Sequence, residues 1–296
     1  MNGIINIYKE ENFTSHDVVN ILRKILKTKK VGHTGTLDPM AKGVLPVCVG
    51  RATKAAELLS QKDKVYSAKL LLGVSTDTQD ITGNILEKNE VNVTEDEIIN
   101  AVNSFIGEIS QIPPMHSAIK KGGKPLYALA RQGVEVERSP RKIHVYDIKI
   151  TKIELPYVYM DMHVSKGTYI RTLCADIGKA LNCGGTMADL VRTKSGQFDI
   201  KSSVRLETLK NAAERGEIEK YIIPVDECFS EYEKITVNEK EEKRIKNGVP
   251  IYFNRGRENE TYRVYNMRGE FLTLSKVVND EGRLKLKLIK SFYEVD

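Results

Sequence analysis

The sequence predicts an α+β fold, in which a mixed α/β main domain spans residues 1–230 and a small β-rich domain spans residues 231–296. Strand-like and helix-like segments alternate through the first part, whereas short strand-like runs separated by turns fill the second. At 296 residues, with 41% hydrophobic and 29% charged side chains, the chain has the composition of a globular protein with a large core.

The first predicted elements of the main domain are a helix, a strand and a second helix. The stretch TSHDVVNILRKILK places its apolar residues on one helical stripe, with Thr14 or Ser15 available as the cap. The short apolar run VYSAKLLL, which a glycine follows, is typical of a strand. In VNVTEDEIINAVNSFIGEI, Thr94 and Glu97 have the spacing of a capping box, and the helical stripe that follows extends to Ile109.

The later elements change from mixed to mostly strand. YVYMDMHV places Val158, Met160, Met162 and Val164 on one face of a strand, and YIRTLCADIGKAL predicts a helix with a glycine inside it. Beyond about Tyr232, VNEKEEKRIKNGVP predicts a short charged helix. TYRVYN, EFLTLSKVV and RLKLKLIKSF then predict three strands, separated by MRG and NDEG turns.

The segment from Gln111 to Lys142 stands apart from its surroundings. IPPM, KKGGKP and ERSPRK place proline, glycine and charge around one helix-like stretch, LYALARQGVEV. Between residues 111 and 150, eight Lys and Arg against three Asp and Glu leave an excess of five positive charges. We interpret the segment as a basic insertion that can attract phosphates, although a run of this kind is more often a solvated face.

Missing motifs exclude several classes of function. The sequence has no phosphate-binding G-x-x-x-x-G-K-[ST] loop, no G-x-S-x-G elbow, no H-x-x-x-H spacing and no zinc deaminase signature. Its four cysteines show no C-x-x-C spacing and are expected to be buried thiols. We therefore expect no metal and no cofactor. No apolar run reaches the roughly 20 residues of a membrane helix, and the start lacks a leader pattern, so we expect a cytoplasmic protein without a membrane partner.

One carboxylate, Asp38, stands in the stretch VGHTGTLDPMAKGVLPV, which otherwise holds glycine, threonine, proline, apolar and a few basic residues. Glycines and the Asp-Pro pair predict a loop there. Asp38 is a candidate catalytic group, and the alternative is that it only caps a turn beside Pro39.

Five stretches, in this order, resemble the motifs of the bacterial tRNA pseudouridine-55 synthases, the TruB family. They are GHTGTLDPMAKGVLPV, YSAKLLLGVSTDTQDITG, IPPMHSAIKKGGKPLYALARQGVEVERSPRKI, VSKGTYIRTLCADIG and MADLVRTKSGQF. The resemblance covers residues 1–230 and implies a mixed, mostly antiparallel sheet flanked by helices. The tail resembles the small PUA-like RNA-binding domain of many members. One departure is KEENFTS, in which Glu10 and Asn12 stand where the family has proline and glycine, while Lys9 is kept.

The resemblance implies an enzyme that turns one uridine of the tRNA T loop into its C-linked isomer without a cofactor. The catalytic aspartate of the family aligns with Asp38, which attacks the sugar or the base or assists proton removal. Arg171 matches the cation that directs this carboxylate and keeps its pKa low. Tyr66 matches the tyrosine that stacks on the flipped base, although on pattern alone a tyrosine opening a strand is usually a core residue.

The resemblance also assigns RNA contacts. In the family His33 lies near the flipped nucleotides, and Leu190 resembles an apolar wall of the uracil pocket. On pattern alone, a loop histidine can equally be a solvated bystander, and a lone leucine is normally a core residue. The substrate contacts further include Lys9. The basic insertion is expected to clasp the tRNA T arm through phosphates. Its candidate residues are Lys120, Lys121, Lys124, Arg131, Arg138 and Arg141.

Two other functions remain open from the sequence. The chain could be a tRNA-binding or tRNA-folding module with a vestigial site, but a pure binder has no chemical reason to keep Asp38, Tyr66 and Arg171 together. It could also be a relative that depends on a guide RNA and partner proteins to place its substrate. The basic insertion favours a stand-alone enzyme, and we expect a monomer with no obligate protein partner.

Overall fold

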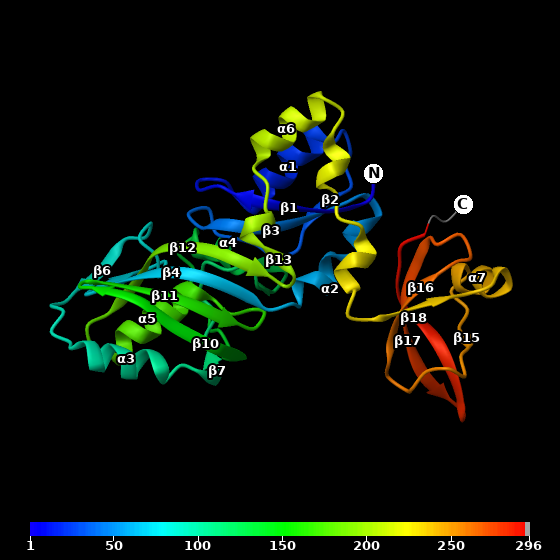
Figure 1. Cartoon of the computed structure of the whole chain (residues 1–296). Helices are drawn as coiled ribbons and strands as arrows, with labels where there is room; N and C mark the ends of the chain where they lie inside the picture. Colours follow the sequence, from blue (N-terminus) through cyan, green and yellow to red (C-terminus); the bar gives the residue numbers. More distant parts are fainter. Residues whose placement is uncertain (294–296) are drawn as a thin grey trace.

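A computed structural model describes residues 1–293 and divides the chain between two sheets (Figure 1). The larger sheet has nine strands, and all its strand pairs are antiparallel except that between β3 and β12. In spatial order its main path runs β1 (Gly3–Lys9), β3 (Lys42–Val49), β12 (Gly185–Ser195), β4 (Lys64–Leu72), β11 (Tyr157–Val164), β10 (Arg141–Glu154) and β7 (Gly107–Gln111), with β2 (Val31–His33) beside β3 and β13 (Phe198–Asp199) beside β12. The mixed α/β class with a mostly antiparallel sheet is confirmed.

Helices pack against this sheet through two core clusters. Two of them, α3 (Glu95–Asn103) and α5 (Ile170–Ala180), bury their apolar faces against β4, β10 and β11. Helices α1 (Ser15–Ile25) and α6 (Leu206–Glu214) bury theirs against β1 and β3 at the other end. The short helix α2 (Ala56–Ser60) lies between β3 and β4 in the chain, on the side of the main body that is next to the second sheet (Figure 1). None of the helices in residues 1–293 is long and apolar enough to cross a membrane.

The parallel contact between β3 and β12 requires a glycine. Arg192 of β12 is the register partner of Gly43, which has φ of +104°. A Cβ on Gly43 would lie 2.2 Å from the carbonyl oxygen of Arg192, so no other side chain fits there. The loop that carries Asp38 enters β3 at this contact.

The second sheet has its own core and is joined to the first by aromatic packing. Its strands are, in spatial order, β14 (Glu233–Thr236), β16 (Thr261–Tyr265), β17 (Phe271–Asp280), β18 (Arg283–Ser291) and β15 (Ile251–Tyr252), with α7 (Glu239–Lys246) beside them. Leu274 and Phe292 of this part belong to a cluster that also contains Phe229, Ala55 and Cys48 of the main body. The two parts therefore share apolar surface.

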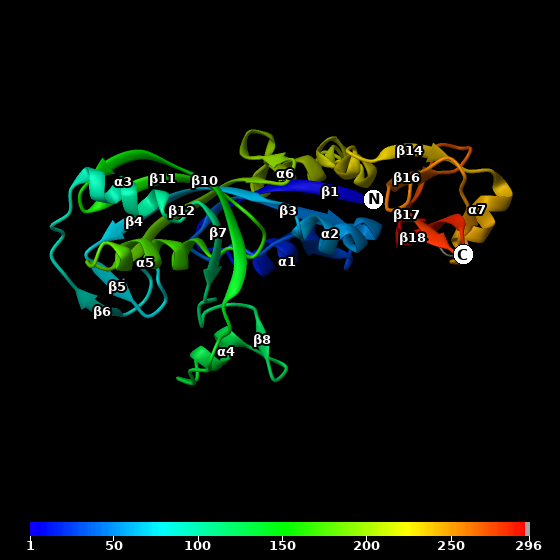
Figure 2. The same ribbon diagram turned by 90° about the horizontal axis from the view of Figure 1, so that it is seen from below.

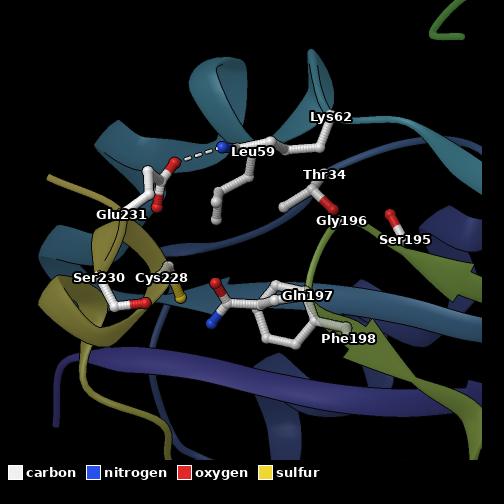
Figure 3. Close-up of a pocket in the computed structure, with 10 residues that line it drawn as sticks. All are labelled: Thr34, Leu59, Lys62, Ser195, Gly196, Gln197, Phe198, Cys228, Ser230 and Glu231. Carbon is white, nitrogen blue, oxygen red and sulfur yellow. Dashed lines mark hydrogen bonds and ion pairs between the residues drawn. The ribbon is translucent and has the colours of Figure 1, made fainter.

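A small pocket of about 260 Å³ lies at the junction of the two parts. Figure 3 shows Cys228 and Glu231, which lead into the second sheet, facing Lys62 and Thr34 of the main body. An ion pair between Lys62 and Glu231 borders this pocket.

Local signals located most of the helix starts and missed two helix ends. Thr94 caps α3 in a capping box with Glu97, as predicted. Of the two candidate caps of α1, Thr14 is the one used, and it forms a capping box with Asp17 that was not predicted. The prediction that the helical stripe of α3 continues to Ile109 is wrong beyond Asn103. The glycine at position 107 adopts φ of +111°, and the chain continues there as β7.

The insertion projects from the body below the end of β7 (Figure 2). Its helix is shorter than LYALARQGVEV suggests, since α4 covers only Leu126–Ala130. Two short strands, β8 (Lys120–Lys121) and β9 (Lys124–Pro125), form a hairpin before it.

Candidate active site

An open cleft of about 900 Å³ brings together segments that are distant in the sequence. They are the loop after β2, the start of β4, the segment before β6 (Ile85–Lys88), the base of the insertion, the start of α5 and the middle of β12. The residues that line it include His33, Asp38, Lys64, Tyr66, Asp80, His116, Tyr127, Arg131, Tyr169, Arg171, Leu190 and Arg192. The three predicted catalytic residues therefore share one site.

The loop that carries Asp38 is fixed from two sides. On the helix side, the hydroxyl of Ser15 accepts a hydrogen bond from the Leu37 amide at 2.9 Å and donates one to the Leu37 carbonyl at 3.2 Å. On the strand side, Arg192 donates to the carbonyls of Gly35 at 3.1 Å and Thr36 at 3.4 Å. A carboxylate on a loop held in this way keeps one position when a ligand arrives.

Arg192 was not foreseen from the sequence. It is 1% exposed and also donates through Nε to the carbonyl of Val44 at 2.7 Å. All its described partners are backbone carbonyls, so its role is to hold the loop rather than to neutralise a carboxylate. Nothing in the sequence around Arg192, MADLVRTKSGQF, distinguishes a buried arginine from a surface arginine.

Arg171 links Asp38 to a second carboxylate. Its Nη2 donates to Asp38 Oδ1 at 3.1 Å and to the His116 carbonyl at 2.7 Å, and its Nη1 lies 3.7 Å from Asp80 Oδ2. The Arg171 side chain is only 6% exposed. Arg171 is the second residue of α5, so the helix fixes the direction of its side chain toward the cleft.

Asp80 is the second residue that the sequence reasoning missed. Its Oδ1 accepts hydrogen bonds from the hydroxyls of Thr78 at 2.9 Å and Thr82 at 2.5 Å and from the Thr82 amide at 3.0 Å. The Asp80 side chain is 6% exposed, against 32% for Asp38. Asp38 is thus the carboxylate that a ligand can reach, whereas Asp80 supports Arg171 from behind.

The pKa of Asp38 corrects one expectation. Arg171 does lower this pKa, as predicted, but burial raises it by more and the neighbouring Asp80 raises it further. The net result is a pKa above the ordinary aspartate value. The expectation that Arg171 holds the pKa low overall was wrong, because the sequence could not show how deeply the loop is buried.

Tyr66 and Leu190 line the cleft from adjacent strands. Tyr66 of β4 is the register partner of Arg192, and Leu190 of β12 is the partner of Ala68. They are 8% and 5% exposed, with core behind them and the cleft in front. Two such side chains can form the walls of a slot for a flat ring.

His33 also lines the cleft, at the end of β2. Burial lowers its pKa, and the positive charge of Arg192 lowers it further. Its Nδ1 accepts a hydrogen bond from the Gly35 amide at 3.3 Å. A neutral imidazole in this position can stack or form hydrogen bonds, but it is not a cation for phosphate at neutral pH.

The expectation that Lys9 contacts RNA is wrong. Lys9 is completely buried, and its ammonium donates to the carbonyls of Phe13 at 2.6 Å, Glu10 at 3.0 Å and Pro39 at 3.1 Å. All three of its protons are used, so it ties the N-terminal loop to the residue after Asp38. Asn12 adopts φ of 67°, a conformation that glycine adopts freely and asparagine tolerates, so the departure in KEENFTS keeps the loop closed.

The basic residues of the insertion differ in their surroundings. Lys120, Lys124 and Arg141 are exposed, and Lys121 is exposed while donating to the Glu137 carbonyl. Arg131 lies at the cleft, with its Cζ 5.6 Å from the ring centroid of Tyr127. Arg138 is partly buried, donates to the Pro113 carbonyl and pairs with Glu135. Arg138 therefore braces the insertion, and the other five are available to a ligand.

Family models match most of the chain. Residues 23–170 match the family described as TruB family pseudouridylate synthase, N-terminal domain, and residues 171–230 match the tRNA pseudouridylate synthase B C-terminal domain. The boundary between the two matches falls in α5 and does not separate the sheets, because β12 lies in the middle of the larger one.

Curated relatives and solved structures agree with these matches. The tRNA pseudouridine synthase B of Clostridium acetobutylicum is 49% identical over 98% of this chain and 100% of its own length. That of Alkaliphilus oremlandii is 51% identical over 86% of this chain and 84% of its own length. A Cbf5-Nop10-Gar1 complex contains a chain with TM-score 0.75 and 28% identity, covering 98% of this chain and 85% of that one. An H/ACA RNP bound to a substrate RNA containing 2'-deoxyuridine contains a chain with TM-score 0.73 and 26% identity, over 99% of this chain and 85% of that one.

Proposed function

Because the chain belongs to the TruB family of pseudouridylate synthases, we propose that it converts uridine 55 in the T loop of tRNA into pseudouridine. In this reaction the bond from N1 to C1′ breaks, the bond from C5 to C1′ forms, and the C5 proton leaves as N1 regains one. Atoms and electrons balance without an oxidant, a reductant or an energy donor.

One observation carries the proposal: Asp38 is the accessible carboxylate of a cleft whose other walls suit a nucleobase. Its oxygen is 3.1 Å from the guanidinium of Arg171, and the slot between Tyr66 and Leu190 lies in the same cleft. Whether the carboxylate attacks the sugar, attacks the base or removes a proton, it has to be ionised and directed. Arg171 does both, since its charge favours the carboxylate form and its two further partners hold it in place.

The uridine reaches this slot by leaving its stack. Turning a base out of a folded loop costs a few kcal/mol, and stacking on an aromatic ring returns roughly 1 to 3 kcal/mol. Tyr66 takes this role, Leu190 forms the opposite wall, and His33 holds neighbouring nucleotides of the opened loop. The exposed side chains of the insertion bind phosphates of the T arm, while the shape of the loop provides specificity.

The second sheet extends the RNA surface in this proposal. Its strand β18 carries Arg283, Lys285, Lys287 and Lys290, and we take residues 231–296 as a PUA-like domain that binds the tRNA body. The chain then acts in the cytoplasm as a monomer, with tRNA as its partner and without a guide RNA.

Asp38→Asn tests the proposal directly. A tRNA transcript with tritium at uridine C5 is incubated with the purified chain alone, and release of label to water is followed. Wild type should release the label of one T-loop uridine stoichiometrically, because the new bond displaces that hydrogen. Asp38→Asn should bind the same tRNA within about twofold of wild type and release nothing, since an amide cannot act as the nucleophile or base.

The outcome separates the alternatives. Full release by Asp38→Asn would refute the assignment of the catalytic group. Tight tRNA binding by wild type without release would favour a binding module, and release that requires an added RNA or protein would favour the guide-dependent relative.

A further inference from the structure

Lys64 occupies the end of the cleft beyond Tyr66. Both side chains point from the same face of β4, two residues apart, which places them about 7 Å from each other along the strand. Lys64 is 8% exposed, and its ammonium donates to the carbonyls of Ser60 at 2.6 Å and Lys62 at 2.5 Å. An ammonium has three protons, so one donor is left for a ligand.

No carboxylate among residues 1–293 forms an ion pair with Lys64. Burial lowers the pKa of Lys64 to about 8, and the positive charges of Arg192 and Lys166 lower it as well, against a partial opposing effect of Asp63. Lys62, two residues earlier, lines the pocket at the junction with the second sheet instead and pairs with Glu231 (Figure 3). Within the described part of the chain, Lys62 therefore has a carboxylate as ion-pair partner, whereas Lys64 is a buried cation that has none.

A buried cation among other cations is costly unless an anion joins it. The space in front of Lys64 is bordered by the turn that precedes α5. Val164 is the register partner of Lys64, and Ser165, Gly167 and Thr168 after it line the same cleft. This end of the cleft therefore combines a positive charge, small polar residues and open space.

We propose that Lys64 binds a phosphate of the RNA backbone next to the flipped uridine. This inference rests on the proposed function, because it takes the uracil ring to lie against Tyr66. A lysine binds phosphate as a point charge. The separation of Lys64 from Tyr66 suits the distance between a base and a phosphate beside its own nucleotide. Lys64 is then a substrate-binding residue that anchors the nucleotide after it has left the stack.

Lys64→Met removes the charge and keeps the length of the side chain. Its Kd for a T-arm stem-loop should rise about tenfold, and the slope of log Kd against log salt should fall by roughly 0.7 to 0.9, because one phosphate contact is lost. The KM should rise with little change in kcat, since the contact exists before and during the reaction. Lys64→Arg, which keeps the charge, should retain the slope.

Lys69→Met is the matched control. Lys69 lies on the same strand but on the opposite face, with its Nζ 3.8 Å from the ring centroid of Tyr157. The substitution changes the net charge equally and should leave the salt slope of binding unchanged. An equal loss of slope in both variants would mean that Lys64 acts only through the overall charge, and would overturn the proposal.

A second measurement uses unaltered protein. Two stem-loops each carry a single neutral methylphosphonate, one on each side of the target uridine. Each is compared with a stem-loop that has an ordinary phosphate there and the same deoxynucleotide at that position. One of the two neutral linkages should weaken binding to wild type about tenfold and should not weaken binding to Lys64→Met further. If neither linkage affects wild type, the proposal fails, whatever the stability of the variant. Pseudouridine formation by wild type is measured in parallel, so that failure of the proposed function itself is recognised separately.

Discussion

At the level of single residues, two opposing influences set the ionisation of Asp38. Burial and Asp80 raise its pKa, whereas Arg171 lowers it, and the net effect is a rise above the ordinary value. If Asp38 has to be ionised for catalysis, the enzyme therefore loses activity on acidification at a higher pH than it would with an exposed aspartate. Arg171 limits this loss, and the hydrogen bonds around Asp80 keep Arg171 in place.

The pH dependence of kcat/KM should reveal this balance. Activity should fall as the pH drops through the raised pKa of Asp38, with a midpoint above the ordinary value of 3.8. In Arg171→Gln the cation that lowers the pKa is gone, so the midpoint should move to higher pH, and the maximum should fall by about 100-fold or more. Arg171→Lys is the control that keeps the charge, and its midpoint should stay closer to wild type. A midpoint that is the same in all three proteins would show that Asp38 is not the titrating group.

Individual residues also mark where prediction from sequence ends. Asp38, Tyr66 and Arg171 were identified through ordered motifs, and the structure brings them into one cleft. Asp80 was missed because its contact with Arg171 joins positions 91 residues apart and leaves no local pattern. Lys9 was misassigned because a lysine that is buried against carbonyls cannot be told from a surface lysine by its neighbours in the chain.

At the level of elements, hydrophobic periodicity predicted the secondary structure correctly where one face of the element is buried. It failed where the same residues fit both a helical and a strand period. The strand YVYMDMHV was predicted from alternation, and all four of its inward side chains are buried: Val158, Met160, Met162 and Val164. The stripe from Ile98 to Ile109 fitted a helix as far as Asn103, but its last residues also fit a strand, and the conformation of Gly107 decides between them. The sheet order could not be predicted, since pairing between β3 and β12 depends on a contact across about 150 residues.

The contact between β3 and β12 yields a prediction for Gly43→Ala. A Cβ there would lie 2.2 Å from the carbonyl of Arg192 in a backbone conformation that alanine resists. The free energy of unfolding should fall by roughly 3 kcal/mol. Displacement of Arg192 should also loosen the loop that carries Asp38 and lower kcat in the fraction that remains folded. Denaturant unfolding and single-turnover kinetics measure the two effects.

Gly32→Ala is the control for this prediction. Gly32 belongs to β2, which pairs with residues 47–49 at the opposite end of β3 from Gly43. It has an ordinary φ, and a Cβ there would meet nothing within 4 Å. Its free energy of unfolding should change by less than about 1 kcal/mol. Equal destabilisation by the two substitutions would mean that close approach at Gly43 is not what the strand contact requires.

At the level of the whole molecule, the second sheet is attached by buried aromatic side chains as well as by the chain itself. Phe292 stacks on Phe271 with ring centroids 5.0 Å apart and lies 6.3 Å from the ring of Phe229 in the main body. The ion pair between Lys62 and Glu231 lies beside this cluster. A fixed attachment matters for the proposed function, because two RNA-binding surfaces in a constant relation bind one tRNA more tightly than two surfaces on a loose linker.

Phe292→Ala tests this attachment. Phe292 is 5% exposed, and removing its ring leaves a cavity between the two parts, so the free energy of unfolding should fall by about 3 kcal/mol. Ile289→Ala, in the strand β18 that ends just before Phe292, changes a side chain that is 39% exposed and should cost no more than about 0.5 kcal/mol. If the interface holds the parts in register, Phe292→Ala should also weaken binding to full-length tRNA while its binding to the isolated T-arm stem-loop stays close to wild type, because only the longer RNA spans both surfaces. Denaturant unfolding and binding titrations with the two RNAs give these values, and unchanged stability of Phe292→Ala would show that the two sheets are joined by the connecting chain alone.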